Sequence, residues 1–210
     1  MGALAIPAAK QASWDGLKPD FQDKILRLAT KLSFDTILVY GTRMLDEQEA
    51  LYAQGRTSPG SVVTNAKPGM SAHNWGLAAD LLPVNPATGK GDWNWDAGFK
   101  VMADEAQALG LRAGYYFKSF VDLPHIEDPS FSVAKAKQWL AEAASDVKEA
   151  AQKALQAATG AARKPEVYWA AIGLAVVATG LWMAVAGRRR AKFSLSEAVE
   201  AFDGIREFMG

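Results

Sequence analysis

The stretch SAHNWGLAADLLPV, residues 71–84, decides the fold because its second half has the composition of a buried strand. It contains His73, one of only two histidines in the chain, and Asp80, which lies seven residues later in an otherwise apolar run. An unpaired carboxylate in a buried strand is costly, so Asp80 needs a partner such as a metal ion. The second histidine, His125, lies in VDLPHIE, residues 121–127, with acidic residues on both sides.

His73, Asp80 and His125 together would supply two imidazoles and one carboxylate, which are good ligands for a single zinc ion. Three protein ligands leave the fourth position open for water, and the ion lowers the pKa of that water to roughly 7. Hydrolysis then needs a further carboxylate as a base, and Asp122 and Glu127 both lie within three residues of His125. The alternative is that each histidine is an ordinary core or surface imidazole.

Asp122 and His125 can act at one site only if their side chains lie on the same side of the chain. In a regular strand the two side chains would point to opposite faces, because their offset is odd. Pro124 lies between them and cannot donate a ladder hydrogen bond. We therefore expect a bulge or a strand end at Pro124 to bring both side chains to one side.

The composition predicts a folded core and excludes some classes of protein. The chain has 210 residues, of which 50% are hydrophobic, and its 23 basic and 23 acidic residues balance. Nucleic-acid binding is not expected, since it needs a concentrated basic surface. The absence of cysteine excludes disulfides and cysteine-based zinc sites, so any metal must be held by His, Asp or Glu.

Helical and strand-like patterns alternate without a regular βαβ rhythm, which predicts an α+β fold with a small antiparallel sheet and flanking helices. The expected helices cover residues 19–32, 45–55 and 96–110, and the expected strands cover 36–42, 76–84 and 119–126. The second helix should be capped by the pair Asp46 and Glu49, and the third by Asp96. Pro124 should cut the last strand short.

The composition changes along the chain, which predicts four segments. Residues 1–131 form the globular domain, and residues 132–165 form an Ala-rich helical linker, or stalk, with Ser132 as its N-cap. Residues 167–187 form a C-terminal transmembrane helix, and residues 188–210 hold a basic cluster and an amphipathic tail.

Residues 167–187 contain no charge over 21 positions, and a helix of that length spans the ~30 Å of bilayer hydrocarbon. The basic cluster that follows favours a cytoplasmic C-terminus and a globular domain on the outer, periplasmic side. The alternative is a buried core helix. Apolar residues from Leu195 to Met209 recur at helical spacing, so the tail is either an amphipathic helix on the membrane or on a partner, or a frayed end.

Three ordered motifs carry a family resemblance. SAHNWGLAAD resembles the Ser-x-His-x-x-Gly-x-Ala-x-Asp motif of the zinc peptidases that include phage L-alanyl-D-glutamate endolysins and D-Ala-D-Ala dipeptidases. FKSFVDLPHIE resembles their Asp-x-Pro-His-aromatic-Glu motif, and YGTRMLDEQEALYAQGRT resembles their upstream Gly-x-Arg segment. The match covers roughly residues 15–130 and implies the hedgehog/DD-peptidase fold.

The resemblance implies a role for each motif residue. The zinc ligands would be His73, Asp80 and His125. Asp122 would be the catalytic base and Arg43 the cation that stabilises the substrate oxyanion. Ser71, Gln48 and Glu127 would lie near the substrate or behind the ligands. Ile126 departs from the family's aromatic residue, a change that we expect to alter the shape of the substrate cleft.

These observations favour a membrane-anchored zinc endopeptidase that cleaves the peptide stems of peptidoglycan at the L-alanyl-D-glutamate bond, in phage lysis or entry. It would be a single-pass protein of the bacterial inner membrane or a phage virion membrane. One alternative is a D,D- or L,D-carboxypeptidase or dipeptidase of cell-wall remodelling. Another is a metal-containing module that binds the wall without cleaving it, although such a binder would have no need of a base at Asp122.

Overall fold

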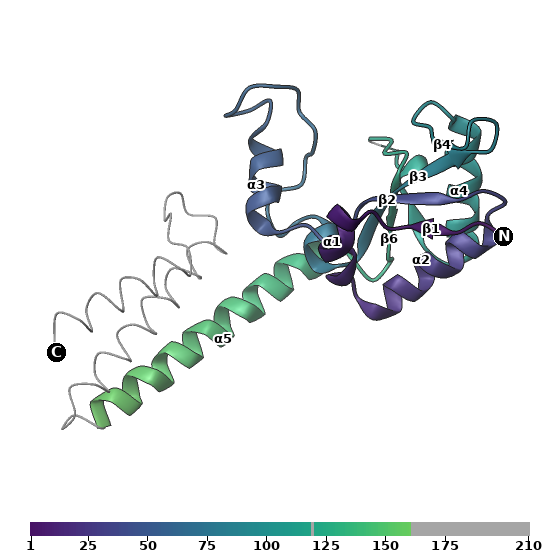
Figure 1. Ribbon diagram of the computed structural model, residues 1–210. Coiled ribbons are helices and arrows are strands. Elements are labelled where there is room, and N and C mark those ends of the chain that lie inside the picture. The colour runs from purple at the N-terminus through teal and green to yellow at the C-terminus, as the bar shows by residue number, and fades with distance from the viewer. Residues whose placement is uncertain (119, 161–210) are drawn as a thin grey trace. The chain divides into compact units, whose positions relative to one another are not determined.

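The computed structural model describes residues 1–118 and 120–160, which form the predicted α+β fold (Figure 1). The strands are β1 (Leu4–Ala5), β2 (Thr36–Tyr40), β3 (Ala78–Asn85), β4 (Lys90–Gly91), β5 (Arg112–Ala113) and β6 (His125–Glu127). The α-helices are α1 (Gln11–Asp15), α2 (Pro19–Lys31), α3 (Leu45–Ala53), α4 (Asp96–Ala108) and α5 (Val133–Gly160). Three 3-10 turns are η1 (Ala8–Lys10), η2 (Ala72–Trp75) and η3 (Gly114–Tyr116). Residues Met1–Ala136 make one compact unit, and a second unit begins at Lys137.

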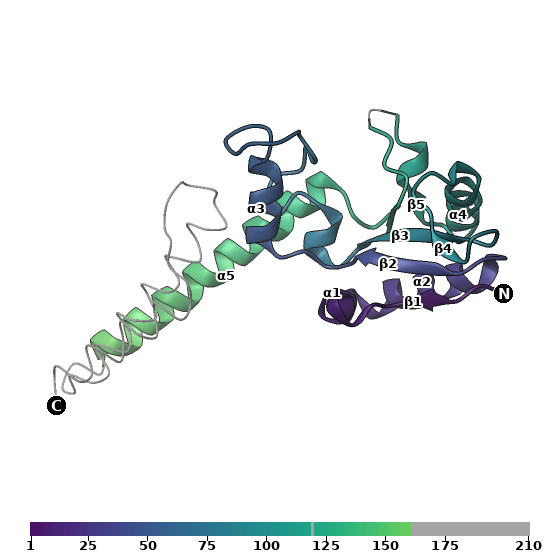
Figure 2. The same ribbon diagram turned by 45° about the horizontal axis from the view of Figure 1, so that its top comes forward.

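The sheet has the strand order β1-β2-β3-β6-β5, and β4 pairs with the far end of β3. All pairs are antiparallel except β1 with β2, which is parallel, so the sheet is mixed rather than purely antiparallel as predicted (Figure 2). The difference arises at Leu4–Ala5, to which the sequence analysis assigned no element. This two-residue edge strand is too short to carry a periodic signal.

The central strand β3 presents two different faces. Ala79 and Leu81 point to one face and are fully buried in the hydrophobic core. Asp80 points to the opposite face, because successive side chains of a strand alternate. The neighbouring strand β6 has the same arrangement, with Ile126 on the core face and His125 on the other. One strand pair therefore supplies both the core and the candidate site.

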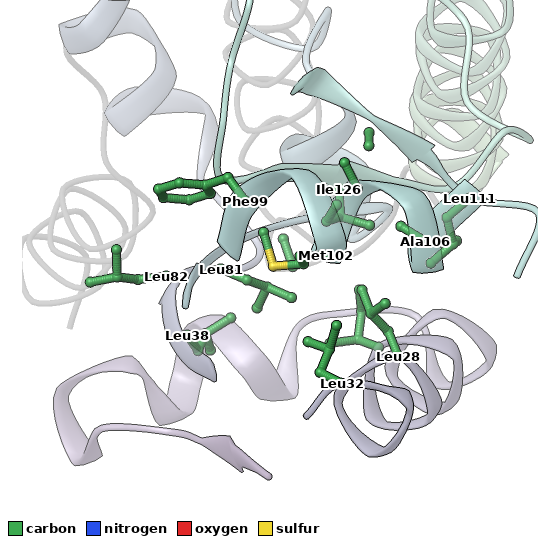
Figure 3. Packing of buried hydrophobic residues seen from close by; sticks show 14 of the residues in the cluster. Leu28, Leu32, Leu38, Leu81, Leu82, Phe99, Met102, Ala106, Leu111 and Ile126 are labelled. Atoms are coloured by element: carbon green, nitrogen blue, oxygen red, sulfur yellow. The ribbon is translucent and has the colours of Figure 1, made fainter. Parts of the chain in front are cut away.

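The core face of the sheet packs against α2 and α4 (Figure 3). The helical residues in this cluster repeat at the predicted spacing and include Phe21, Ile25, Leu28 and Leu32 from the α2 segment and Phe99, Met102 and Ala106 from α4. Burying this many large apolar side chains supplies most of the driving force for folding. The apolar periodicity of both helices is thus confirmed.

The helix starts differ from the predicted caps. Glu47 Oε2 accepts a hydrogen bond of 3.0 Å from the Met44 backbone N–H, because α3 begins at Leu45 and Glu47 is its third residue. The predicted Asp46–Glu49 pair is therefore wrong, since it lies two residues beyond the observed pair of Met44 and Glu47. In α4 the N-cap is Trp95, and Asp96 lies in the first turn. Ser132 does cap α5, since its Oγ accepts the Lys135 N–H at 3.2 Å.

The last strand begins at His125, after Pro124 instead of before it. The turn at Leu123–Pro124 confirms the strand end expected at Pro124, whereas residues 120–122 do not form the strand that was predicted there. The Pro124 carbonyl still accepts a 2.9 Å hydrogen bond from Leu81 N, so the turn is joined directly to β3. The strand β6 begins only after Pro124, because proline has no N–H to donate to the ladder.

Ile126 lies in the core, with no exposed surface, on the side of β6 opposite His125. The expectation that its departure from the family's aromatic residue alters the substrate cleft is therefore wrong. Ile126 packs with the apolar side chains of the core.

None of the helices in the described part of the chain is long and apolar enough to cross a membrane. The predicted transmembrane helix at 167–187 and the predicted tail helix at 195–209 lie outside the described residues.

We predict that Ile126→Ala lowers the free energy of unfolding by about 2–5 kcal/mol, because it leaves a cavity in a fully packed core. Urea unfolding followed by circular dichroism measures the change. Val101→Ala, at a position that is 42% exposed, is the control and should stay within about 0.5 kcal/mol of wild type. Equal effects of the two substitutions would contradict the core position of Ile126.

Candidate metal centre

Three segments bring His73, Asp80 and His125 together. The register of β3 and β6 places Asp80 directly opposite His125, and η2 carries His73 just before β3. Gly76 turns the chain from η2 into β3 with φ +67°. A Cβ atom there would lie 2.6 Å from the Gly16 carbonyl oxygen, so only glycine fits this connection.

The three candidate ligand atoms form a nearly equilateral triangle. His73 Nε2 lies 3.3 Å from Asp80 Oδ1, His125 Nδ1 lies 3.2 Å from the same oxygen, and the two nitrogens are 3.2 Å apart. A tetrahedral zinc ion with ligands at ~2.0–2.1 Å requires ligand atoms about 3.3 Å from one another. The donor set and its spacing therefore fit one zinc ion, as the sequence predicts.

The hydrogen bonds on the outer side of each imidazole select the tautomer. His73 Nδ1 lies 2.7 Å from the Gly41 carbonyl oxygen, which only accepts, so Nδ1 carries the proton and Nε2 keeps its lone pair. His125 Nε2 lies 3.3 Å from Glu127 Oε2, which likewise leaves Nδ1 free. In the neutral form that binds a metal, each imidazole therefore directs a lone pair toward Asp80. Without a metal, a proton on that nitrogen bonds to Asp80 instead. Sequence reasoning missed the role of the Gly41 carbonyl.

The electrostatics of this buried space favour positive charge. Burial opposes the charged form of Asp80, but the His73 charge and hydrogen bonds from both imidazoles hold the pKa of its carboxyl well below the usual range. Burial likewise opposes the charged form of His125, yet its bonds to Asp80 and Glu127 raise its pKa to about 9. A divalent cation would supply the positive charge that this space favours. Its binding would release the proton from His125.

Asp122 joins the cluster through the turn before β6. Its backbone N–H donates to the Gly114 carbonyl at 3.0 Å, and its own carbonyl accepts the His125 N–H at 3.2 Å. Burial raises the pKa of the Asp122 carboxyl and the Asp80 charge raises it further, while His125, His73 and Arg43 oppose the shift. The turn places Asp122 Cβ and His125 Cβ side by side against Gly114, so Asp122 lies next to the candidate ligand His125.

Gly114 makes this turn possible. A Cβ atom on Gly114 would lie 2.4 Å from the Asp122 carbonyl oxygen and 2.9 Å from His125 Cβ. No side chain fits between the start of η3 and the Asp122 turn. Gly114 was not predicted from the sequence, although a glycine next to strand-like residues does signal a close backbone approach.

Arg43 lies on the other side of Asp80, with Nη2 3.9 Å from Asp80 Oδ2. Its Nη1 donates to Gln48 Oε1 at 3.0 Å, and its guanidinium lies over the Tyr40 ring. Gln48 is fully buried and its amide donates to the Ala66 carbonyl at 2.8 Å. Arg43 is thus a cation held in one orientation beside the candidate metal site.

Ser71 and Glu127 have different positions relative to the ligands. Ser71 is the half-buried residue before η2, and its hydroxyl makes no capping bond to that turn. Its contact with substrate stays a prediction. Glu127 is buried and contacts His125, so its place behind a ligand agrees with the prediction.

The His-Asp-His cluster has the three protein ligands and open fourth position that are typical of mononuclear zinc hydrolases. The family model of D-alanyl-D-alanine carboxypeptidase VanY matches residues 18–121. The chain is also 34% identical over 113 residues to the peptidoglycan L-alanyl-D-glutamate endopeptidase CwlK of Bacillus subtilis (strain 168), covering 50% of this chain and 67% of that protein. The chain belongs to the VanY family of zinc metallopeptidases, as its three motifs predict.

The solved structure of the Serratia marcescens L-Ala D-Glu endopeptidase ChiX is similar to this chain with a TM-score of 0.43 and 22% sequence identity. The similarity covers 57% of this chain and 86% of that one.

We predict that Gly114→Ala weakens zinc binding by roughly 10-fold or more, because the new methyl group displaces His125 and the Asp122 turn. Competition with a chromophoric chelator measures the zinc affinity. Gly89→Asn is the matched control, since its Cβ would meet no atom and Asn tolerates the positive φ of that turn. Zinc affinity in Gly114→Ala equal to that of the control would refute this steric role.

Proposed function

We propose that this protein is a zinc endopeptidase that cleaves the peptide stems of peptidoglycan, with the L-alanyl-D-glutamate bond as its target. The observation that carries the proposal is the triangle of His73 Nε2, His125 Nδ1 and Asp80 Oδ1, with Asp122 in the turn that leads directly into His125. The choice of bond is supported by the activity named for the Bacillus subtilis relative, at 34% identity.

The chain's own residues have distinct roles in this mechanism. Bound by His73, Asp80 and His125, zinc would supply Lewis-acid polarisation of the scissile carbonyl and of the attacking water. Asp122 accepts the proton of that water and passes it to the leaving amine. Its raised pKa suits this role, since a carboxyl that is weakly acidic holds the proton longer between the two transfers.

Arg43 stabilises negative charge that develops on the substrate carbonyl oxygen. Its guanidinium is held by Gln48 and by the Tyr40 ring, so little reorganisation is needed during the reaction. The arginine also lies close enough to Asp80 to offset part of the carboxylate charge in the site.

A D,D- or L,D-carboxypeptidase or dipeptidase is the second candidate, favoured by the description of the matching family model. The two activities differ in the fragments that they release. A carboxypeptidase frees a terminal amino acid, whereas the endopeptidase frees a peptide that begins with D-glutamate. Mass spectrometry of digested peptidoglycan therefore separates the two candidates, and the absence of any released fragment would favour a wall-binding module.

We predict that Asp122→Asn lowers peptidoglycan hydrolysis by roughly 10²–10⁴-fold, because the amide cannot accept the proton of the attacking water. Zinc content, measured by atomic absorption, should remain about one ion per chain, since Asp122 is not among the three candidate ligands. Asp23→Asn, an exposed acid on α2, should retain wild-type activity. Full activity in Asp122→Asn would show that another group is the base.

We also propose that residues 167–187 anchor the protein in a bacterial inner membrane or a phage virion membrane, with the peptidase domain on the periplasmic side. The charge-free length of the segment and the arginines that follow it support this topology. Anchoring would raise the local concentration of enzyme at the wall and would suit a role in phage lysis or entry. A helix at 195–209 would lie on the membrane surface or on a partner.

Protease treatment of inverted inner-membrane vesicles checks this topology. The peptidase domain should be protected inside the vesicle, whereas a tag at the C-terminus should be removed. Recovery of the full-length chain in the soluble fraction after cell lysis would contradict the anchor.

A further inference from the structure

Arg112 forms a cross-strand pair with Glu127. The two residues lie opposite each other in the antiparallel register of β5 and β6, so their side chains share one face of the sheet. Arg112 Nη2 lies 2.9 Å from Glu127 Oε1. The glutamate side chain is only 11% exposed, and the arginine approaches it from the solvent side with 42% exposure.

The second oxygen of Glu127 contacts the candidate ligand His125. Oε2 lies 3.3 Å from His125 Nε2, and the two residues are on the same face of β6 because they are two positions apart. Each carboxylate oxygen therefore has its own partner. Arg112, Glu127 and His125 form a continuous line from the sheet edge to the candidate metal site.

We propose that Arg112 is a positioning residue for the metal site, which it controls by fixing the Glu127 carboxylate that orients His125. The proposal rests on the proposed function, because it concerns zinc bound by His125. A carboxylate behind a ligand histidine sets the tautomer and the ring orientation, and such partners affect metal affinity strongly. Without Arg112, the Glu127 side chain regains rotational freedom and holds the imidazole less well.

A purely structural role for Arg112 is the competing explanation. Its Nη2 also donates to the Phe131 carbonyl at 2.6 Å and so links β5 to the segment after β6. Loss of that bond would lower stability without changing the geometry of His125. Stability alone therefore cannot test the proposal, and the zinc affinity must be measured.

The chain offers a matched control one residue further along. Lys24 Nζ lies 2.6 Å from Asp128 Oδ2, and Asp128 is as buried as Glu127. Both pairs join an exposed cation to a buried acid at the end of β6. The carboxylate of Asp128 is bonded to Lys24 and Ser130, and neither is a candidate zinc ligand. Lys24→Met should therefore remove a comparable ion pair without changing zinc affinity.

The experiment measures the dissociation constant of zinc alone for the purified full chain, by chelator competition at one fixed pH. Arg112→Met should weaken zinc binding by roughly 3- to 10-fold, and Arg112→Lys should recover part of that loss, since its ammonium can reach only one partner well. Glu127→Gln should weaken binding by about 10-fold. Adding Arg112→Met to Glu127→Gln should cause no further loss, because Arg112 acts through Glu127.

Two results would overturn the inference while leaving the proposed function intact. One is wild-type zinc affinity in Arg112→Met, and the other is an equal further loss when it is added to Glu127→Gln. Should Arg112→Met fail to fold, the same cycle with Arg112→Lys decides, with an expected loss of about twofold that disappears in the Glu127→Gln background. If wild type itself binds no zinc, both the inference and the proposed function are wrong.

Discussion

The antiparallel pairing of β3 with β6 is the constraint on which the rest of the structure depends. It sets Asp80 opposite His125 on one face of the sheet and Ala79 opposite Ile126 on the other. A slip of one residue would turn Asp80 into the core and an apolar side chain into the site. The hydrophobic packing that fixes the register therefore also fixes the geometry of the ligands.

Placing two imidazoles and two carboxylates in one buried space is unfavourable unless each group has partners. The structure supplies them from outside the cluster. The Gly41 carbonyl bonds His73, Arg43 lies beside Asp80, and Arg112 pairs with Glu127. These contacts use backbone and side chains from separate elements, so the site depends on the whole domain being folded.

The three candidate ligands could be predicted from the sequence because both motifs lie in or directly beside strands, which local sequence indicates. His73 and Asp80 are linked by one short turn and a strand, and His125 begins the next paired strand. Periodicity also predicted the buried faces of α2 and α4. The strand end at Pro124 was also expected, but the bond from Asp122 N to the Gly114 carbonyl was not, because it joins segments that local sequence does not relate.

The sequence by itself determined the class of fold, the apolar faces of the helices, and the three residues that could hold a metal. It did so through local spacing and through three motifs that resemble the zinc peptidase family, neither of which depends on contacts between distant segments. Only the tertiary structure decided that Asp122 bonds to Gly114, that Ile126 belongs to the core, and that Gly114 leaves room for the turn. Those features depend on contacts between segments that are distant in the chain, or on a strand register that local sequence does not encode.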